Sequence, residues 1–257
     1  MHIAVDIVCS LMLLFCGLGV YTLIFWLLIN KEMTLGKALQ LCTAALVLNK
    51  FLFTGIGYAA VSGKLKSDEF PLHKSISAFV LSEMFVITPW VVSGLYFGAR
   101  VGLKIPLIFI IFLLLALVFL LYKRKKAQRF LQEAAAYVRE TSVHLGCVLP
   151  LAVINILISI TYYYFLFDAF RVSMSFAEVF KIVSVSFTVG YLSPLPSGLA
   201  FREGSMIFLL MQQGLAFNKA LSIALTDRLA VTVFFIVIGF LCAAQIIIPA
   251  LTKSKKG

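Results

Sequence analysis

Long apolar stretches dominate the chain, and five of them are long enough to cross a lipid bilayer as a single helix. A membrane-spanning helix needs about 20 consecutive apolar residues. The stretches that meet this length cover residues 3–29, 75–98, 103–122, 144–167 and 219–248. The pattern therefore predicts an all-α integral membrane protein with about five full spans.

Two further apolar stretches, residues 38–61 and 176–213, are each interrupted near the middle. The second holds 38 residues, whereas two full crossings with a turn need about 42–45, at roughly 20 per crossing. Its interruption contains two prolines, which remove backbone donors and disfavour helix, and Gly198, which permits a tight turn. Both stretches are therefore predicted to form re-entrant hairpins, each made of two short helices that enter and leave on the same side.

The place of the second interruption in the fold follows from its backbone. Open backbone at membrane depth is stable only where it is buried in protein or lines a water-filled cavity. The interruption at residues 192–203 is therefore expected inside the helix bundle. The first hairpin is interrupted by Asn49-Lys50 and by Gly55 and Gly57.

The composition supports a membrane protein and excludes a soluble one. Hydrophobic residues make up 62% of the chain and charged residues 13%, against about 45–50% and about 25% in soluble domains. The net charge of +11 fits basic membrane loops beside anionic lipid, and no nucleic-acid partner is expected. The 24 phenylalanines and 9 tyrosines are interpreted as lipid-facing surface and interfacial aromatic belts.

The positions of lysine and arginine predict the orientation. If both hairpins are re-entrant and residues 123–129 are cytoplasmic, 14 of the 22 lysines and arginines fall on the cytoplasmic side and 4 on the outer side. Cytoplasmic loops carry an excess of basic residues. The protein is therefore expected in the cytoplasmic (inner) membrane, with the N-terminus outside and the C-terminus in the cytoplasm. A helix over residues 128–141 is expected to lie in the cytoplasmic interface.

An internal repeat runs through the chain at a constant offset of 144 residues. Residues 72–88 and 216–232 align at this offset, and each segment follows an interrupted hairpin. The matched pairs are Glu83 with Asp227, Leu81 with Leu225, Ser82 with Thr226, and Thr88 with Thr232. By the charge assignment the two copies cross the membrane in opposite directions.

The predicted fold class is therefore an inverted-topology repeat. Residues 1–100 form the first repeat (span, hairpin, span), residues 101–142 a linking span with the basic interfacial helix, and residues 143–257 the second repeat with a basic tail. Inverted repeats with broken helices are a recurring plan of transporters, which bind substrate near the membrane midplane between the repeats.

Ionisable residues inside the apolar segments are the first candidates for a site, because each costs about 2.5–3.5 kcal/mol at the centre of a membrane helix. A helix predicted to begin near Leu199 carries Arg202 in its first turn, where free backbone N–H groups favour an anion. Arg202 is therefore the leading candidate to bind a phosphate. The alternative is a structural salt bridge from Arg202 to Asp227 or Glu83.

The other candidates also have two interpretations each. Glu203 either carries a proton or coupling ion or accepts Arg228, and Lys50 either contacts the ligand or extends to the interface. The full set of candidate substrate-binding residues is Asn49, Lys50, Glu83, Pro196, Ser197, Gly198, Arg202, Glu203, Asp227 and Arg228. The five cysteines and three histidines show no metal-ligand spacing, so no metal or cofactor is expected.

Residues 196–203, which read Pro-Ser-Gly-Leu-Ala-Phe-Arg-Glu, are followed by Asn-Lys-Ala at 218–220 and Thr-Asp-Arg-Leu at 226–229. This part of the chain resembles the transmembrane region of the lysylphosphatidylglycerol synthase/flippase family, whose pattern typically reads Pro-Gly-Gly-x-Gly-x-Arg-Glu. Ser197 and Ala200 stand where that pattern has glycine. The resemblance implies lipid translocation or an accessory role in the assembly of surface lipids or glycans.

The first hairpin departs further from the family pattern. Asn49, Gly55 and Gly57 hold similar places, whereas Phe53 and Tyr58 stand where the family has proline and glutamate. This difference leaves the lipid open. The aminoacyl-transferring domain of bifunctional family members is not expected in this chain, so synthesis of a lysyl-lipid is not expected either.

The leading hypothesis is a flippase that moves an anionic phospholipid or a polyprenyl-phosphate-linked lipid. The alternative is a non-catalytic membrane subunit of a glycosyltransferase or lipid-modifying assembly that builds the cell envelope. Catalysis is not expected, because no nucleophile with a neighbouring base stands out in the sequence. Expected partners are membrane lipids with anionic headgroups; a glycosyltransferase or lipid-synthase partner and a homo-oligomer are left open.

Overall fold

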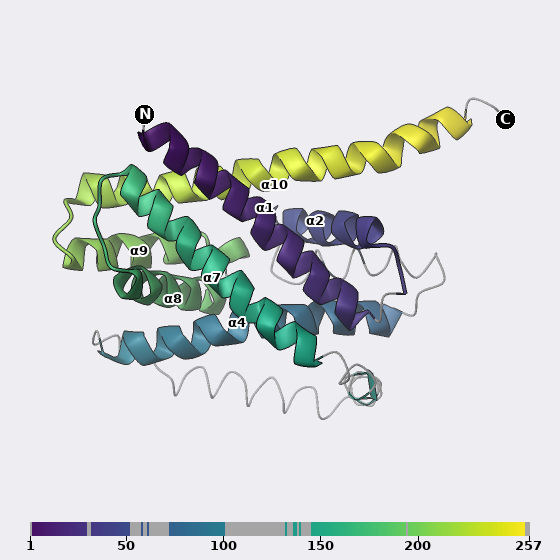
Figure 1. Cartoon of the computed structure of the whole chain (residues 1–257), viewed down its shortest axis with the longest axis horizontal. Coiled ribbons are helices and arrows are strands. Elements are labelled where there is room, and N and C mark those ends of the chain that lie inside the picture. Colours follow the sequence, from purple (N-terminus) through teal and green to yellow (C-terminus); the bar gives the residue numbers. More distant parts are fainter. Residues whose placement is uncertain are drawn as a thin grey trace.

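In the computed structural model the described part of the chain consists of helices joined by short connections, and it contains no strand (Figure 1). The structure describes residues 2–29, 32–51, 72–100, 145–193 and 195–254, and the single residues Tyr58, Val61, Gln132, Ala136, Tyr137 and Arg139. The prediction of an all-α fold is confirmed for this part of the chain. The predicted span at 103–122 and most of the predicted interfacial helix at 128–141 lie outside the described residues.

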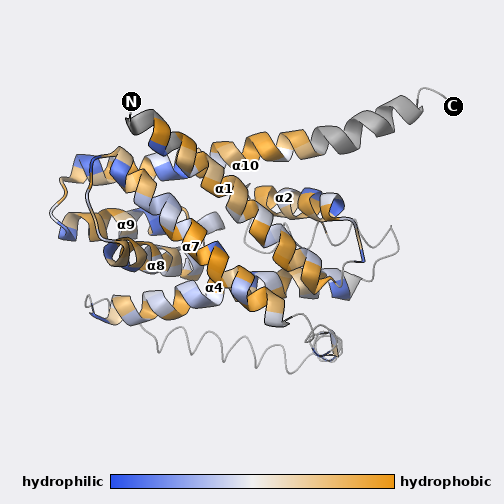
Figure 2. Ribbon diagram, in the orientation of Figure 1, coloured by the Kyte–Doolittle hydropathy of each residue, from blue (hydrophilic) through white to orange (hydrophobic). Residues whose placement is uncertain are grey.

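Four long helices correspond to four of the five predicted spans. They are α1 (His2–Leu28), α4 (Leu72–Arg100), α7 (Leu145–Ala169) and α10 (Phe217–Ser254). Each contains a segment that is long and apolar enough to cross a membrane. Figure 2 shows apolar residues along most of the length of α1 and α7 and along the middle of α10.

Three shorter helices come from the two interrupted stretches. The first stretch gives α2 (Leu35–Phe51), and the second gives α8 (Phe176–Leu192) and α9 (Phe201–Gln212). A capping box fixes the start of α8, since the Ser175 hydroxyl accepts from the Glu178 backbone N–H while the Glu178 carboxylate accepts from the Ser175 backbone. The predicted interruption of the second stretch is confirmed.

The interruption between α8 and α9 has a backbone that cannot continue a right-handed helix. A single 3₁₀ turn, η3 (Pro196–Gly198), follows α8. Ser197, Gly198 and Ala200 have φ of 56°, 67° and 67°, in the left-handed region that L-residues adopt only at a cost. Consequently α9 begins at Phe201, two residues after the start predicted near Leu199, and Arg202 lies in its first turn as predicted.

The two ends of the α8–α9 segment lie close together. The Nζ of Lys219, in the first turn of α10, donates to the backbone carbonyl of Arg171, just before α8, at 3.4 Å. Figure 1 shows the α7–α8 and α9–α10 connections at the same end of the molecule, on the left of the view. The segment therefore starts and finishes at one end of the helix bundle.

Helices from the two halves of the chain pack across each other. Helix α1 lies along α7, α4 lies along α8, and α10 lies along both α2 and α9. Glycine allows close approach at two of these crossings: a Cβ on Gly94 of α4 would stand 2.1 Å from Thr188 Oγ1 of α8, and a Cβ on Gly239 of α10 would stand 2.6 Å from Val47 Cγ2 of α2. Small residues at helix crossings are typical of membrane bundles.

Candidate functional site

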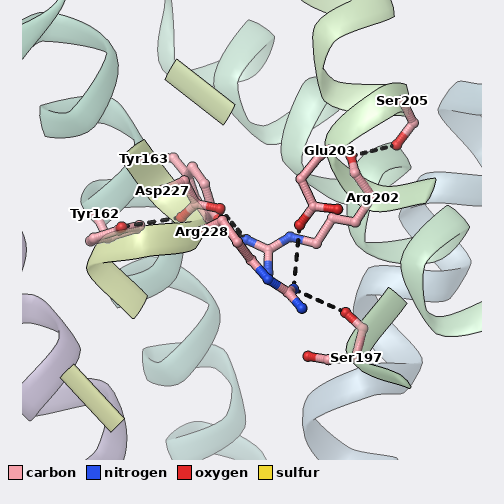
Figure 3. A network of polar contacts seen from close by, with 8 residues as sticks. All are labelled: Tyr162, Tyr163, Ser197, Arg202, Glu203, Ser205, Asp227 and Arg228. Atoms are coloured by element: carbon pink, nitrogen blue, oxygen red, sulfur yellow. Dashed lines mark hydrogen bonds and ion pairs between the residues drawn. The ribbon is translucent and has the colours of Figure 1, made fainter. Parts of the chain in front are cut away.

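A buried ion pair joins the start of α9 to the first third of α10. Arg202 is 6% exposed and Asp227 is 2% exposed, and Nη2 of Arg202 donates to Oδ2 of Asp227. We call this contact the central ion pair (Figure 3). The alternative interpretation of Arg202, a salt bridge to Asp227, is therefore confirmed.

Two neighbouring tyrosines of α7 complete the environment of the central ion pair. The Tyr162 hydroxyl donates to Asp227 Oδ1 at 3.1 Å, and the Tyr163 hydroxyl donates to Asp227 Oδ2 at 3.2 Å. Tyr163 also accepts a hydrogen bond from Nη2 of Arg202. Both carboxylate oxygens are thus bonded, as a buried charge requires.

The residues next to the central ion pair form a second ion pair with the charges reversed. Arg228 Nη1 lies 3.3 Å from Glu203 Oε1 and donates to the backbone carbonyl of Ser197 at 3.2 Å. Figure 3 shows Arg228 reaching toward both groups. The second ion pair therefore ties the interruption and the first turn of α9 to α10, as the alternative interpretation of Glu203 held.

Two glycines let the interruption pack directly against the end of α8. A Cβ on Gly198 would lie 2.6 Å from the Cα of Gly190, and a Cβ on Gly190 would lie 3.0 Å from the Cβ of Arg202. The Arg202 stem therefore runs over Gly190, and its guanidinium lies 4.6 Å from the centre of the Phe187 ring. A cation over an aromatic face is stabilised there.

A second carboxyl of the membrane-spanning part is bonded by tyrosine hydroxyls. Tyr21 of α1 donates to Oε1 of Glu83 on α4 at 2.9 Å, and Tyr58 donates to the same oxygen. We call these three residues the Glu83 cluster. Glu83 was a candidate from the sequence, whereas its tyrosine partners were not.

The central ion pair and the Glu83 cluster meet at one cavity of about 270 Å³. Its wall includes Arg202 and all three members of the Glu83 cluster, together with side chains from α1, α2, α4, α7, α8 and α10. The predicted candidates that line it are Asn49, Glu83, Ser197, Gly198 and Arg202. Candidates that were predicted from both halves of the chain therefore lie at one cavity.

Three of the remaining candidates, Glu203, Asp227 and Arg228, are not among the residues that line the cavity. Asp227 is the buried partner of Arg202, and Glu203 with Arg228 forms the second ion pair. Pro196 lies in the 3₁₀ turn η3 and Lys50 lies in α2, but the side chains of both are outside the described part of the structure.

One donor of Arg202 has no acceptor among the described residues. Its Nε is buried and makes no hydrogen bond there, although Nη2 makes two. Buried polar groups in native structures are almost always hydrogen-bonded. Because Nε is itself buried, an oxygen of a ligand in the cavity would reach it only after the Arg202 side chain turns toward the cavity.

Comparison with known proteins identifies the family. The family described as "Lysylphosphatidylglycerol synthase TM region" matches residues 3–239. The chain belongs to this family. No curated protein and no solved structure matches it significantly.

Membership in the lysylphosphatidylglycerol synthase transmembrane-region family gives the structure its context. The match runs from the start of α1 to residue 239 within α10, so it includes the described residues of the cavity and both ion pairs. Together with the four apolar helices, it makes the protein a multi-pass membrane protein with a lipid-related function.

The tyrosines of the site were missed in the sequence. All tyrosines were assigned to lipid-facing surface and aromatic belts, but Tyr21, Tyr58, Tyr162 and Tyr163 are buried and bond the two carboxylates. That assignment is wrong for these four residues. A buried tyrosine hydroxyl usually has a hydrogen-bond partner. A tyrosine within a predicted span, in a chain that also has carboxyls within its spans, could therefore have been proposed as a partner of one of those carboxyls.

Proposed function

We propose that the protein moves a phosphate-bearing lipid headgroup across the cytoplasmic membrane through the cavity at Arg202. The supporting observation is the buried Arg202, which lines the cavity and keeps an Nε–H without an acceptor among the described residues. Arginine presents several N–H donors in a fork that matches phosphate oxygens. In this proposal the Arg202 side chain turns so that a phosphate oxygen accepts from Nε, while Nη2 stays on Asp227.

The size of the cavity favours a headgroup rather than a whole lipid. Its volume of about 270 Å³ is close to the lower end of ligand pockets, which run from about 300 to 1,000 Å³. In this proposal the polar headgroup occupies the cavity while the acyl chains stay in the bilayer.

The arrangement of the helices supports alternating access between two inverted halves. In the proposal one half is α1, α2 and α4, and the other is α7, α8–α9 and α10. The first spans of the two halves, α1 and α7, pack on each other. The last span of each half packs on a hairpin helix of the other half, α4 on α8 and α10 on α2. Rocking of one half against the other would expose the cavity to each side in turn.

The contact between Arg171 and Lys219 supports a re-entrant α8–α9 hairpin, because it holds the two ends of that segment together. The interruption would then stand at membrane depth with Arg202 at its tip. We infer the orientation from the distribution of basic residues, with the N-terminus outside.

Headgroup movement in proteoliposomes tests the proposal. The probe is a fluorescent phosphatidylglycerol in phosphatidylcholine vesicles, with the outer leaflet quenched by dithionite. Arg202→Lys keeps a cation beside Asp227 but lacks the Nε–H and the fork. Losing a hydrogen bond to a charged group costs about 1.5–3 kcal/mol, so the initial rate should fall at least about tenfold.

The matched control is Arg100→Ala, which removes an exposed arginine at the end of α4 and should leave the rate unchanged. An Arg202→Lys protein as active as the wild type would overturn the role of Arg202. A wild-type rate equal to that of protein-free vesicles, with a glycosyltransferase or lipid synthase co-purifying in stoichiometric amount, would favour the membrane-subunit alternative.

A further inference from the structure

The Glu83 cluster lies on the wall of the same cavity as Arg202, and the proposed headgroup pathway does not yet use it. Glu83 is within the membrane-spanning segment of α4, and its Oε1 accepts from both Tyr21 and Tyr58. The two tyrosine oxygens are themselves 3.4 Å apart. Intramembrane carboxyls at such positions commonly bind protons or ions.

The offset of 144 residues relates the two carboxyl sites of the cavity to each other. It pairs Glu83 with Asp227, and it also pairs Tyr58 with Arg202. In the second half the carboxylate is bonded by an arginine and two tyrosines, and in the first half two tyrosines donate to it. Protonation of Asp227 would break the central ion pair, whereas protonation of Glu83 leaves that pair intact.

The charge of Glu83 acts directly on an anionic headgroup. Among the described residues that line the cavity, the charged ones are Glu83 and Arg202, and Asp227 already balances Arg202. A phosphate and an ionised Glu83 in one small cavity within the membrane repel each other more strongly than in bulk water, because the protein and lipid around them screen charge less. A proton on Glu83 removes this repulsion.

We propose that Glu83 is a proton-binding site coupled to the headgroup, so that a proton and a phosphate-bearing headgroup load the cavity together. The inference rests on the proposed function. The coupling is reciprocal: the proton favours headgroup binding as much as the headgroup favours protonation. The energy source of the transport would then be the proton gradient.

Several other titratable groups surround this site, and none of them replaces Glu83 in the argument. Within the described residues they are the following: Tyr21 on α1; Cys42 on α2; Tyr58, which follows α2; Tyr162 and Tyr163 on α7; Tyr191 on α8; Arg202 on α9; and Asp227 on α10. Phenols and the thiol are ordinarily neutral and arginine is charged at neutral pH, and Asp227 is held by Arg202. Glu83 is the carboxyl among the described residues that line the cavity, so a headgroup bound there lies beside it.

The test is the pH dependence of headgroup movement in the same vesicles, with the pH varied on the side from which the fluorescent phosphatidylglycerol departs. Where Glu83 is mostly ionised, the rate should rise up to about tenfold for each unit of acidification. Glu83→Gln should flatten this slope, and Glu83→Asp, which keeps the carboxyl, should retain a slope. Asp168→Asn changes an exposed carboxyl at the end of α7 and should behave as the wild type.

Infrared difference spectroscopy of the purified protein supplies a second measurement that does not need transport. A carboxyl band should titrate, should grow when phosphatidylglycerol is added, and should be missing in Glu83→Gln but not in Asp168→Asn. A flat pH profile in an active wild type overturns the coupling and leaves the proposed function standing. An inactive wild type overturns the proposed function, and a band unmoved by phosphatidylglycerol then overturns the proton site as well.

Discussion

Removal of the Asp227 carboxylate should destabilise the protein far more than removal of any exposed ion-pair partner. The carboxylate accepts hydrogen bonds from Arg202, Tyr162 and Tyr163 and is 2% exposed. Asp227→Ala leaves the Arg202 guanidinium buried without its counter-charge. Breaking a buried ion pair in this way costs about 3–5 kcal/mol.

The measurement is the free energy of unfolding in mixed micelles, with helix content followed by circular dichroism as the denaturing detergent increases. The control is Glu32→Ala, which removes one partner of a surface pair with Lys74 at 3.4 Å. Exposed pairs contribute about 0–1 kcal/mol, so this variant should remain close to the wild type.

A double variant separates stability from function. Arg202→Met with Asp227→Leu removes both charges and fills their space with apolar atoms, a change that is often neutral or stabilising. It should recover most of the stability lost by Asp227→Ala and should still fail to move headgroups. A loss below about 1 kcal/mol for Asp227→Ala, or a double variant no more stable than the single one, would refute this reasoning.

Two further predictions concern the packing around the central ion pair. Gly198→Ala should destabilise the protein by more than about 1 kcal/mol, because the residue has a φ of 67° and the added Cβ would lie 2.6 Å from Gly190. Gly204→Ala, with open space around it, should be neutral or slightly stabilising. Equal effects of the two changes in the same unfolding assay would contradict the described packing of Gly198 against Gly190. Tyr163→Phe should lower the free energy of unfolding by about 1–3 kcal/mol, because Arg202 and Asp227 each lose a hydrogen bond. Tyr164→Phe changes an exposed ring and should lower it little. The order of the two unfolding midpoints checks this prediction.

The sequence was sufficient for the features that depend on composition and on backbone chemistry. Uninterrupted apolar runs predicted the four long helices, because length and hydropathy decide whether a helix can span a bilayer. Proline and glycine predicted the interruption between α8 and α9. The adjacent charges at Arg202-Glu203 and Asp227-Arg228 limited the ion pairs to a few alternatives, and the structure shows which of them form.

The partners of the two carboxylates could not be predicted from the sequence. Helices α1 and α7 are apolar on all sides, so no periodicity shows which face is buried. Which tyrosine meets which carboxyl depends on the rotation and register of helices far apart in the chain. The start of α9 lies two residues later than predicted, because Ala200 has a positive φ that an alanine in the sequence gives no reason to expect.

The most direct test of the account is the side of the membrane on which each end of the α8–α9 segment lies. Single cysteines replace Phe176 and Gln213, both exposed, in a background without the native cysteines, and an impermeant maleimide is applied to intact cells. Cysteines at Gly146 and Asp168, near opposite ends of α7, serve as references for the two sides. The account predicts that the cysteines at 168, 176 and 213 react from outside and that the one at 146 reacts only after permeabilisation; reaction of 176 and 213 from opposite sides would contradict it.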